Sequence, residues 1–136
     1  MPSSKRILAV LIALLLMPLT VVASATAAQA AASGLTATFS VSGTNAKYVI
    51  ANTTDAAVTG WTLEFDLPDG VSIGGVQNGK STQDGNHVTI INEYYNATVP
   101  AGGDTEPYSP SFTISAADAP PGCKINGDNC DGSPDT

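Results

Sequence analysis

Apolar and polar residues alternate along most of the chain after residue 34. In "LTATFSVS" (35–42) every second residue is apolar, and "WTLEFDL" (61–67) follows the same pattern. A period of two predicts half-buried β-strands, because successive side chains of a strand point to opposite faces. Residues 46–54 and 87–92 also predict strands, and we expect the last strand near residues 111–115.

Turn signals separate these segments. Pro68-Asp69-Gly70 joins a residue of fixed φ to one that tolerates a positive φ, and Gln83–Asn86 contains the Asp-Gly pair typical of a hairpin. Short strands, polar turns and no helical periodicity after the N-terminal segment predict an all-β fold, an antiparallel β-sandwich of immunoglobulin-like or jelly-roll-like type. We assign the sandwich to residues 34–117, and the Pro-, Gly- and Asp-rich residues 118–136 to a tail outside the core.

Trp61 is the only tryptophan in the chain. A lone tryptophan in a β-domain could be a ligand platform, but the alternation places it on the same strand face as Leu63, Phe65 and Leu67. Those three side chains cannot all face water, so we expect Trp61 in the structural core. Three further aromatic residues are expected there for the same reason: Phe39, Tyr48 and Phe112.

The first 30 residues have the pattern of a secretory signal peptide. Lys5 and Arg6 precede an apolar run over 7–17, and Ala-x-Ala triplets end at residues 25, 27 and 30. The run is shorter than the roughly 20 residues of a membrane span, although an uncleaved N-terminal anchor is the alternative. We expect a secreted, extracellular protein whose mature form has no membrane partner.

Removal of residues 1–30 leaves a strongly acidic chain of about 105 residues. It contains twelve acidic residues and only three basic ones, Lys47, Lys80 and Lys124, which gives a net charge of about −9. Such a chain repels phosphates, so nucleic acid and anionic lipid are poor candidate partners. Neutral ligands remain compatible with this charge.

The two cysteines, Cys123 and Cys130, lie close together near the C-terminus. In an exported protein they predict a local disulfide. With a single histidine and no second pair of thiols, the chain predicts no zinc site, and we expect no metal and no cofactor. The acidic segment "DNCDGSPD" lacks the spacing of an EF-hand loop, which leaves a loose calcium site as an alternative.

No catalytic residues are expected. Glu64 and Asp66 lie two apart on the polar face of one strand, and we expect only water between them rather than the cleft that a glycosidase needs. His87 has no evident triad partners in the sequence. The structural interpretation of all three is a solvated strand face.

Tyr94 and Tyr95 are adjacent in "NEYYNATVPAGG" (92–103). If this segment is extended, the two rings point to opposite faces, so at most one of them belongs to the core. The other must then meet solvent or a partner.

Three stretches together resemble the family 2 carbohydrate-binding modules, the cellulose-, xylan- and chitin-binding β-sandwiches of actinobacterial polysaccharide hydrolases. They are "GWTLEFDLPDG", "NEYYNATVPAGG" and "CKINGDNCDG", in the family's order and spacing. The last is similar to the ending of modules on secreted actinobacterial chitinases. The matching positions are Asn52, Gly60, Trp61, Pro68, Asn92, Tyr95, Asn96, Val99, Gly102 and Gly103.

The resemblance implies a sugar-binding face with three exposed aromatic rings in a line. Tyr95 matches the third ring, which leaves Tyr94 as a packing or flanking residue. The second ring would fall near Gln77, where no aromatic stands, and the first would lie in the loop shortened here to "SGTN". We expect hydrogen bonds to sugar from Asn96, Gln77, Asn78 and Gln83; their alternative role is turn and edge polarity.

The predicted function is therefore non-catalytic binding of an insoluble polysaccharide, chitin or cellulose, by a monomeric secreted module. A single stacking ring predicts weak binding, about millimolar. The alternative is a secreted β-sandwich that has lost its sugar face and serves as a structural or protein-interaction domain.

Overall fold

The computed structural model describes residues 33–134. The predicted signal segment, 1–30, lies outside the described residues. The described part contains no helix that is long and apolar enough to cross a membrane. Its strands are β1 Leu35–Ser42, β2 Asn45–Asn52, β3 Val58–Thr59, β4 Thr62–Asp66, β5 Ile73–Gln77, β6 Lys80–Asp84, β7 His87–Ile91, β8 Thr98–Val99, β9 Ser111–Ile114, β10 Lys124–Ile125 and β11 Asp128–Asn129.

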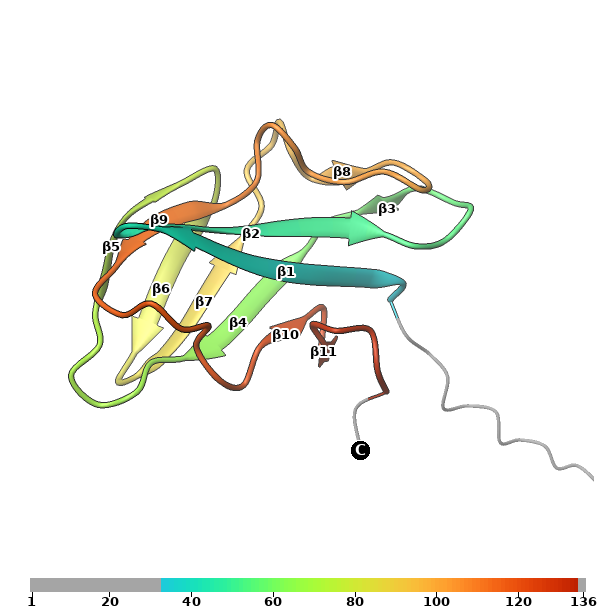
Figure 1. The fold of residues 1–136 in the computed structure, drawn as a ribbon. Coiled ribbons are helices and arrows are strands. Elements are labelled where there is room, and N and C mark those ends of the chain that lie inside the picture. Colours follow the sequence, from blue (N-terminus) through green and yellow to red (C-terminus); the bar gives the residue numbers. More distant parts are fainter. Residues whose placement is uncertain (1–32, 135–136) are drawn as a thin grey trace, which may run out of the picture. The chain divides into compact units, whose positions relative to one another are not determined.

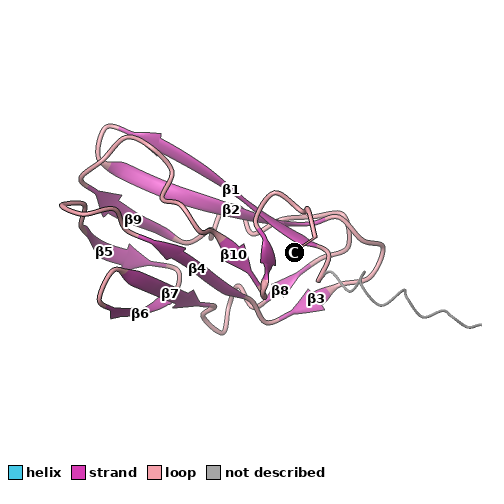
Figure 2. Cartoon of the chain, turned by 90° about the horizontal axis from the view of Figure 1, so that it is seen from below, coloured by secondary structure: helices cyan, strands magenta, loops and turns pink. Residues whose placement is uncertain are grey.

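Two antiparallel sheets pack against each other, which confirms the predicted β-sandwich. One sheet has the order β1-β2-β9-β5 and the other the order β11-β10-β4-β7-β6, while β3 and β8 form a small separate ribbon. Figures 1 and 2 show the two layers, with β1, β2 and β9 in one and β4, β6 and β7 in the other. The predicted hairpin joins β6 to β7 through Gly85, which has a positive φ of 61°.

The core lies between the two inner sheet faces, as the alternation predicts. Register pairs Leu63 with Ile90 and Phe65 with Val88, and these four side chains are fully buried. Trp61 is only 2% exposed, which confirms its predicted core position. Tyr48 stacks on Phe65 with ring centroids 5.5 Å apart. Phe39, at the open edge of the sandwich, is only partly buried against this core.

The tail is not outside the core, and the last strand is not at 111–115. β10 pairs with β4, so that Ile125 lies opposite Leu63 and is fully buried. The predicted disulfide Cys123–Cys130 is present, and the Cys130 carbonyl accepts a 2.9 Å hydrogen bond from the Ala37 amide of β1. The tail therefore links the edges of both sheets. Sequence pattern missed this because a two-residue strand is too short to show a period.

Candidate functional site

Tyr94 and Tyr95 lie in a turn, not in a strand. The Asn96 amide donates back to the Glu93 carbonyl at 3.4 Å, and the residues between them form the turn. The argument that successive rings point to opposite faces holds only for extended chain. Both rings are consequently exposed, Tyr94 at 90% and Tyr95 at 47%, so of the two roles expected for Tyr94, packing or flanking, the structure excludes packing. As a flanking ring it contacts Tyr95 at 5.3 Å between centroids.

A third exposed ring, Tyr108, completes the group. It is 54% exposed and lies 5.8 Å from Tyr95 between ring centroids. We call Tyr94, Tyr95 and Tyr108 the tyrosine surface. Sequence reasoning missed Tyr108, although a signal was available. Pro107 and Pro110 lie on either side of Tyr108, and proline is rare in strand interiors. These two prolines indicate that Tyr108 lies in a loop, where its ring can be exposed.

Asn78 fixes the central ring of this surface. The Tyr95 hydroxyl donates a 2.8 Å hydrogen bond to Asn78 Oδ1, while Asn78 Nδ2 donates to the Ser109 carbonyl at 3.1 Å. Asn78 has a φ of 61°, a left-handed conformation that asparagine adopts more readily than most residues. Partial burial raises the pKa of the Tyr95 hydroxyl further above neutral pH, where a tyrosine hydroxyl is already protonated and able to donate. Asn78 therefore positions Tyr95.

Asn96 is buried beneath the surface and is not open to solvent. It is 6% exposed, and its amide donates to the Asn78 carbonyl at 2.8 Å and the Tyr108 carbonyl at 2.9 Å. Its Oδ1 accepts from the Glu93 amide at 2.8 Å. Both amide hydrogens are thus used within the protein. The structure places Asn96 as the residue that ties the three segments of the site together, rather than as a direct partner of sugar.

The site is also anchored to the core through Trp61. Its Nε1 donates to the Asn96 carbonyl at 2.9 Å, and its backbone amide donates to Asn92 Oδ1 at 3.0 Å. Residues at both ends of the turn that carries Tyr94 and Tyr95 are therefore hydrogen-bonded to the buried Trp61. A shift of Trp61 would move the turn directly.

The two predicted glutamines lie in different places. Gln77 is exposed at the end of β5, directly before Asn78, and pairs with Ser111 of β9. Gln83 lies near the opposite end of β6, and its amide donates to the Gly85 carbonyl at 3.0 Å. Gln77 is therefore a sequence neighbour of Asn78, the residue that bonds Tyr95, whereas Gln83 lies at the hairpin between β6 and β7.

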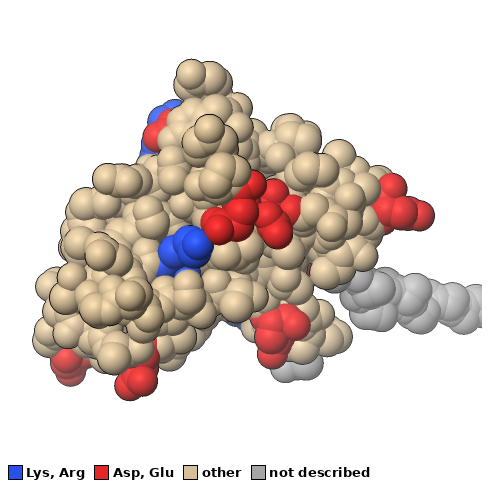
Figure 3. All heavy atoms as spheres, turned by 45° about the horizontal axis from the view of Figure 1, so that its top comes forward, with Lys and Arg blue, Asp and Glu red and all other residues tan. Residues whose placement is uncertain are grey.

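Charged groups near the tyrosine surface form an ion pair instead of a catalytic dyad. Lys47 Nζ lies 2.9 Å from Glu106 Oε1. A hydrogen bond from the Ser109 hydroxyl, followed by the bond from Lys47, holds the pKa of Glu106 below its usual range. A general acid of a glycosidase needs a raised pKa. In Figure 3 acidic and basic atoms occupy a few small areas, and most of the visible face is uncharged.

On the other sheet, His87 stands between Glu64 and Asp66. Its Nδ1 lies 2.7 Å from Asp66 Oδ1, and its Nε2 lies 2.8 Å from Glu64 Oε1. The expectation that only water separates the two carboxylates is therefore wrong. Cross-strand register explains the difference, because His87 pairs directly with Asp66. The hydrogen bond to Asp66, and then that to Glu64, raises the pKa of His87.

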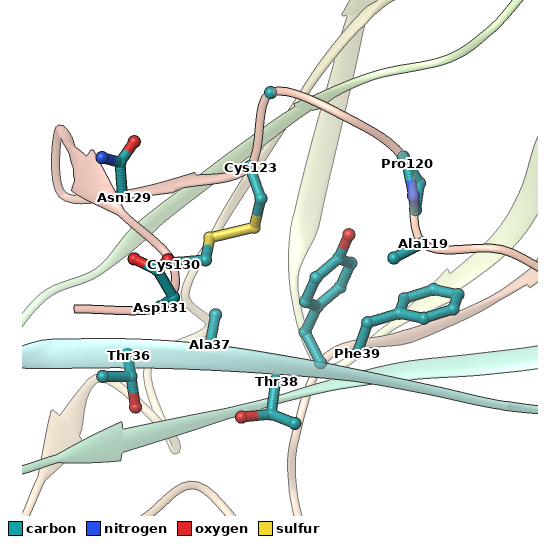
Figure 4. A pocket seen from close by; sticks show the side chains of 12 residues that line it. Thr36, Ala37, Thr38, Phe39, Ala119, Pro120, Cys123, Asn129, Cys130 and Asp131 are labelled. Atoms are coloured by element: carbon teal, nitrogen blue, oxygen red, sulfur yellow. A yellow bond between two sulfur atoms is a disulfide. The ribbon is translucent and has the colours of Figure 1, made fainter. Parts of the chain in front are cut away.

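A groove of about 750 Å³ lies between β1 and the tail, away from the tyrosine surface. In Figure 4 the disulfide lies above Ala37, and the Phe39 ring lies below Ala119. Its one carboxylate, Asp131, is hydrogen-bonded by the Ser133 hydroxyl, which lowers its pKa. The lining therefore offers no pair of carboxyl groups for hydrolysis. Among the described residues no cluster of His, Cys, Asp or Glu has the arrangement of a metal site.

A β-sandwich that presents exposed rings on a rigid support is typical of a module that binds ligands at its surface. The chain belongs to the cellulose-binding domain family, which matches residues 25–130. It is 37% identical over 131 residues to chitinase 63 of Streptomyces plicatus, a match that covers 92% of this chain and 21% of that enzyme.

A second relative is similar over most of its own length. The chain is 32% identical over 119 residues to a cellulose/chitin binding protein of Mycobacterium bovis, covering 88% of this chain and 82% of the relative. Among solved structures, the chitin-binding domain of Chi18aC from Streptomyces coelicolor matches with a TM-score of 0.57 and 33% identity, over 75% of this chain and 99% of that domain. The chain spans about a fifth of the length of chitinase 63.

Proposed function

We propose that this domain binds chitin or cellulose without catalysis, through the tyrosine surface. The observation that carries the proposal is the group of three exposed rings, in which Tyr94 and Tyr108 each contact Tyr95, with Asn78 and Asn96 holding the group in place. Exposed aromatic side chains held rigidly offer large contact area at low entropic cost, because their positions are already fixed before the ligand binds. Two relatives whose names refer to chitin or to cellulose/chitin support the same substrate class.

Two of these rings stand outside the positions that the family resemblance implies. The sequence predicted one remaining ring, Tyr95, and hence weak binding. Tyr94 supplies a second ring from the same turn, and Tyr108 supplies a third from the loop before β9. Several weak stacking contacts acting together raise affinity above that of one ring. The proposal therefore assigns affinity to rings that this chain has gathered from new positions.

The charge of the domain bears on which other partners it can bind. An acidic domain suits a neutral polysaccharide, and we propose that it has no nucleic-acid or membrane partner and acts as a monomer outside the cell. Gln77 is exposed and directly precedes Asn78 in the chain, and it is our proposed hydrogen-bond partner for sugar hydroxyl groups. Asn78 and Asn96 act on sugar indirectly, by holding the rings.

A retention assay tests the proposal. The wild-type domain, Tyr95→Ala and the control Gln83→Ala are incubated with chitin and with cellulose, and the unbound protein is measured. Wild type and the control should be retained on at least one polymer, and Tyr95→Ala should lose about tenfold in affinity. If wild type remains unbound on both polymers, or if all three proteins bind equally, the tyrosine surface is not a sugar site, and the structural or protein-interaction role gains support.

A further inference from the structure

The three rings of the tyrosine surface do not share a plane. The planes of Tyr94 and Tyr95 meet at 90°, and those of Tyr95 and Tyr108 at 78°. Both contacts are edge to face, with Tyr95 in the middle. The surface is therefore an aromatic corner and not a flat platform.

This geometry limits the form of glycan that fits. The exposed sugar faces of a flat crystal surface are parallel, so such a surface can stack squarely on one of the three rings at a time. A single chain can rotate about its glycosidic bonds, and successive sugar units can then face different directions. Only the single chain can stack on two mutually perpendicular rings together.

The shape of the protein surface around the aromatic corner also favours a single glycan chain over a crystal face. Tyr94 is 90% exposed and therefore projects from its turn, which prevents flush contact of a flat crystal with the neighbouring rings. A hollow of about 330 Å³ lies between β2, β9 and β5, and on its wall is Gln77, the residue directly before Asn78 in the chain. A hollow can receive a sugar unit of a loose chain but not the flat face of a crystal.

The polar residues in the lining of this hollow add a chemical reason. Besides Gln77 they are Asn45, Ser111 and Thr113, and the apolar residues Ala46 and Phe112 line it as well. Hydroxyl groups of a crystalline polymer are bonded to neighbouring chains, whereas those of a single chain are free to exchange water for protein partners. Protein hydrogen bonds of this kind contribute only when both partners are available.

We propose that the tyrosine surface takes one β-1,4-linked glycan chain, bent across the aromatic corner and continuing into the hollow beside Gln77. The occupant is a soluble oligomer or a loose chain in a disordered region of the polymer, in preference to a crystal face. This inference rests on the proposed function and deepens it.

The test compares physical forms of one polymer. Retention is measured on crystalline and on amorphous chitin, and separately on crystalline and amorphous cellulose, normalised to accessible surface. Soluble oligomers of each sugar are added as competitors, and the tyrosine signals are followed by NMR. The proteins are wild type, Tyr95→Ala, Tyr108→Ala, Gln77→Ala and the control Gln83→Ala.

The expected result has three parts. The amorphous form retains wild type better than the crystalline form, the soluble oligomer releases the protein, and the oligomer shifts the signals of Tyr95 and Tyr108. Tyr108→Ala lowers affinity for the oligomer by on the order of tenfold, and Gln77→Ala lowers it by a smaller factor. The control binds as wild type does.

Two results overturn the inference. One is retention on the crystalline form equal to or above that on the amorphous form, and the other is a lack of competition by the oligomer. If either result is seen and Tyr95→Ala still loses binding, the tyrosine surface remains the proposed sugar site. Only the preference for a single glycan chain is then rejected. If no form of either polymer retains wild type, or if Tyr95→Ala binds as wild type does, the proposed function itself fails.

Discussion

The Tyr95 hydroxyl donates a 2.8 Å hydrogen bond to Asn78 Oδ1, although 17 positions separate the two residues in the sequence. The bond joins the turn after β7 to the turn between β5 and β6. It fixes the orientation of the central ring of the tyrosine surface. The residue that orients the ring is therefore as important to the site as the ring itself.

This relationship predicts how two variants combine. Asn78→Gly keeps a residue that tolerates the positive φ and removes the side chain, and Tyr95→Phe keeps the ring face and removes the hydroxyl. Each should weaken sugar binding by about 0.5–1.5 kcal/mol, the usual net value of one hydrogen bond. The double variant should lose less than the sum, because both remove the same bond. Titration with a glycan oligomer measures the coupling, and strict additivity would contradict a positioning role for Asn78.

Trp61 should connect stability to binding. Trp61→Phe leaves a void in the core and removes the 2.9 Å hydrogen bond from Nε1 to the Asn96 carbonyl. We expect a loss of about 2–4 kcal/mol in the free energy of unfolding, measured by denaturant titration. Under conditions where the variant is fully folded, its sugar binding should also be weaker. Unchanged binding would show that the turn keeps its position without this bond.

The histidine between two carboxylates predicts a pH-dependent stability. The pKa of His87 is raised in the folded state, so its stabilising effect is fully present below the unfolded value of about 6.5 and is lost as pH rises through the folded value. Only imidazolium can donate from both nitrogens, to Asp66 and Glu64. The difference in Tm between wild type and His87→Gln should be larger near about pH 5.5 than near about pH 8.5. A difference that is equal at both values would show that the protonated form is not favoured by folding.

The disulfide should stabilise the fold without taking part in binding. Cys123 and Cys130 close a short loop, seven positions apart. The double variant Cys123→Ser/Cys130→Ser should lose roughly 2–3 kcal/mol of stability in thermal or chemical unfolding, by the chain-entropy estimate. Its glycan affinity, measured where it is folded, should equal that of wild type. Reductant should lower the Tm of wild type toward that of the variant and leave the variant unchanged.

Gly79, between Asn78 and β6, has no room for a side chain. A Cβ there would lie 2.5 Å from Ile90 Cγ2 and 3.2 Å from the Ile91 carbonyl oxygen. Gly79→Ala should therefore cost about 1–3 kcal/mol of stability and displace Asn78, with weaker sugar binding as a result. Gly74→Ala is the matched control, because its Cβ would meet only Thr113 Oγ1 at an ordinary 3.5 Å. Equal unfolding midpoints for the two variants would contradict this account.

Period-two alternation by itself determined the fold class and the part of the core that β4 supplies. Side chains two apart on a strand share a face, so the burial of Leu63 and Phe65 required Trp61 to be buried with them. The spacing of Cys123 and Cys130 likewise indicated their disulfide. These features depend on neighbours in the sequence, and sequence pattern contains that information.

Only the tertiary structure decided how distant residues meet. The turn at Tyr94 and Tyr95 exposed both rings, and the loop before β9 brought Tyr108 beside them. Cross-strand register placed His87 between Glu64 and Asp66, and the pairing of β10 with β4 brought Ile125 into the core. The contacts of Tyr108, His87 and Ile125 join segments that are separated in the chain, and the turn at Tyr94 departs from extended backbone. Sheet register and loop geometry fix these positions, and no local period records them.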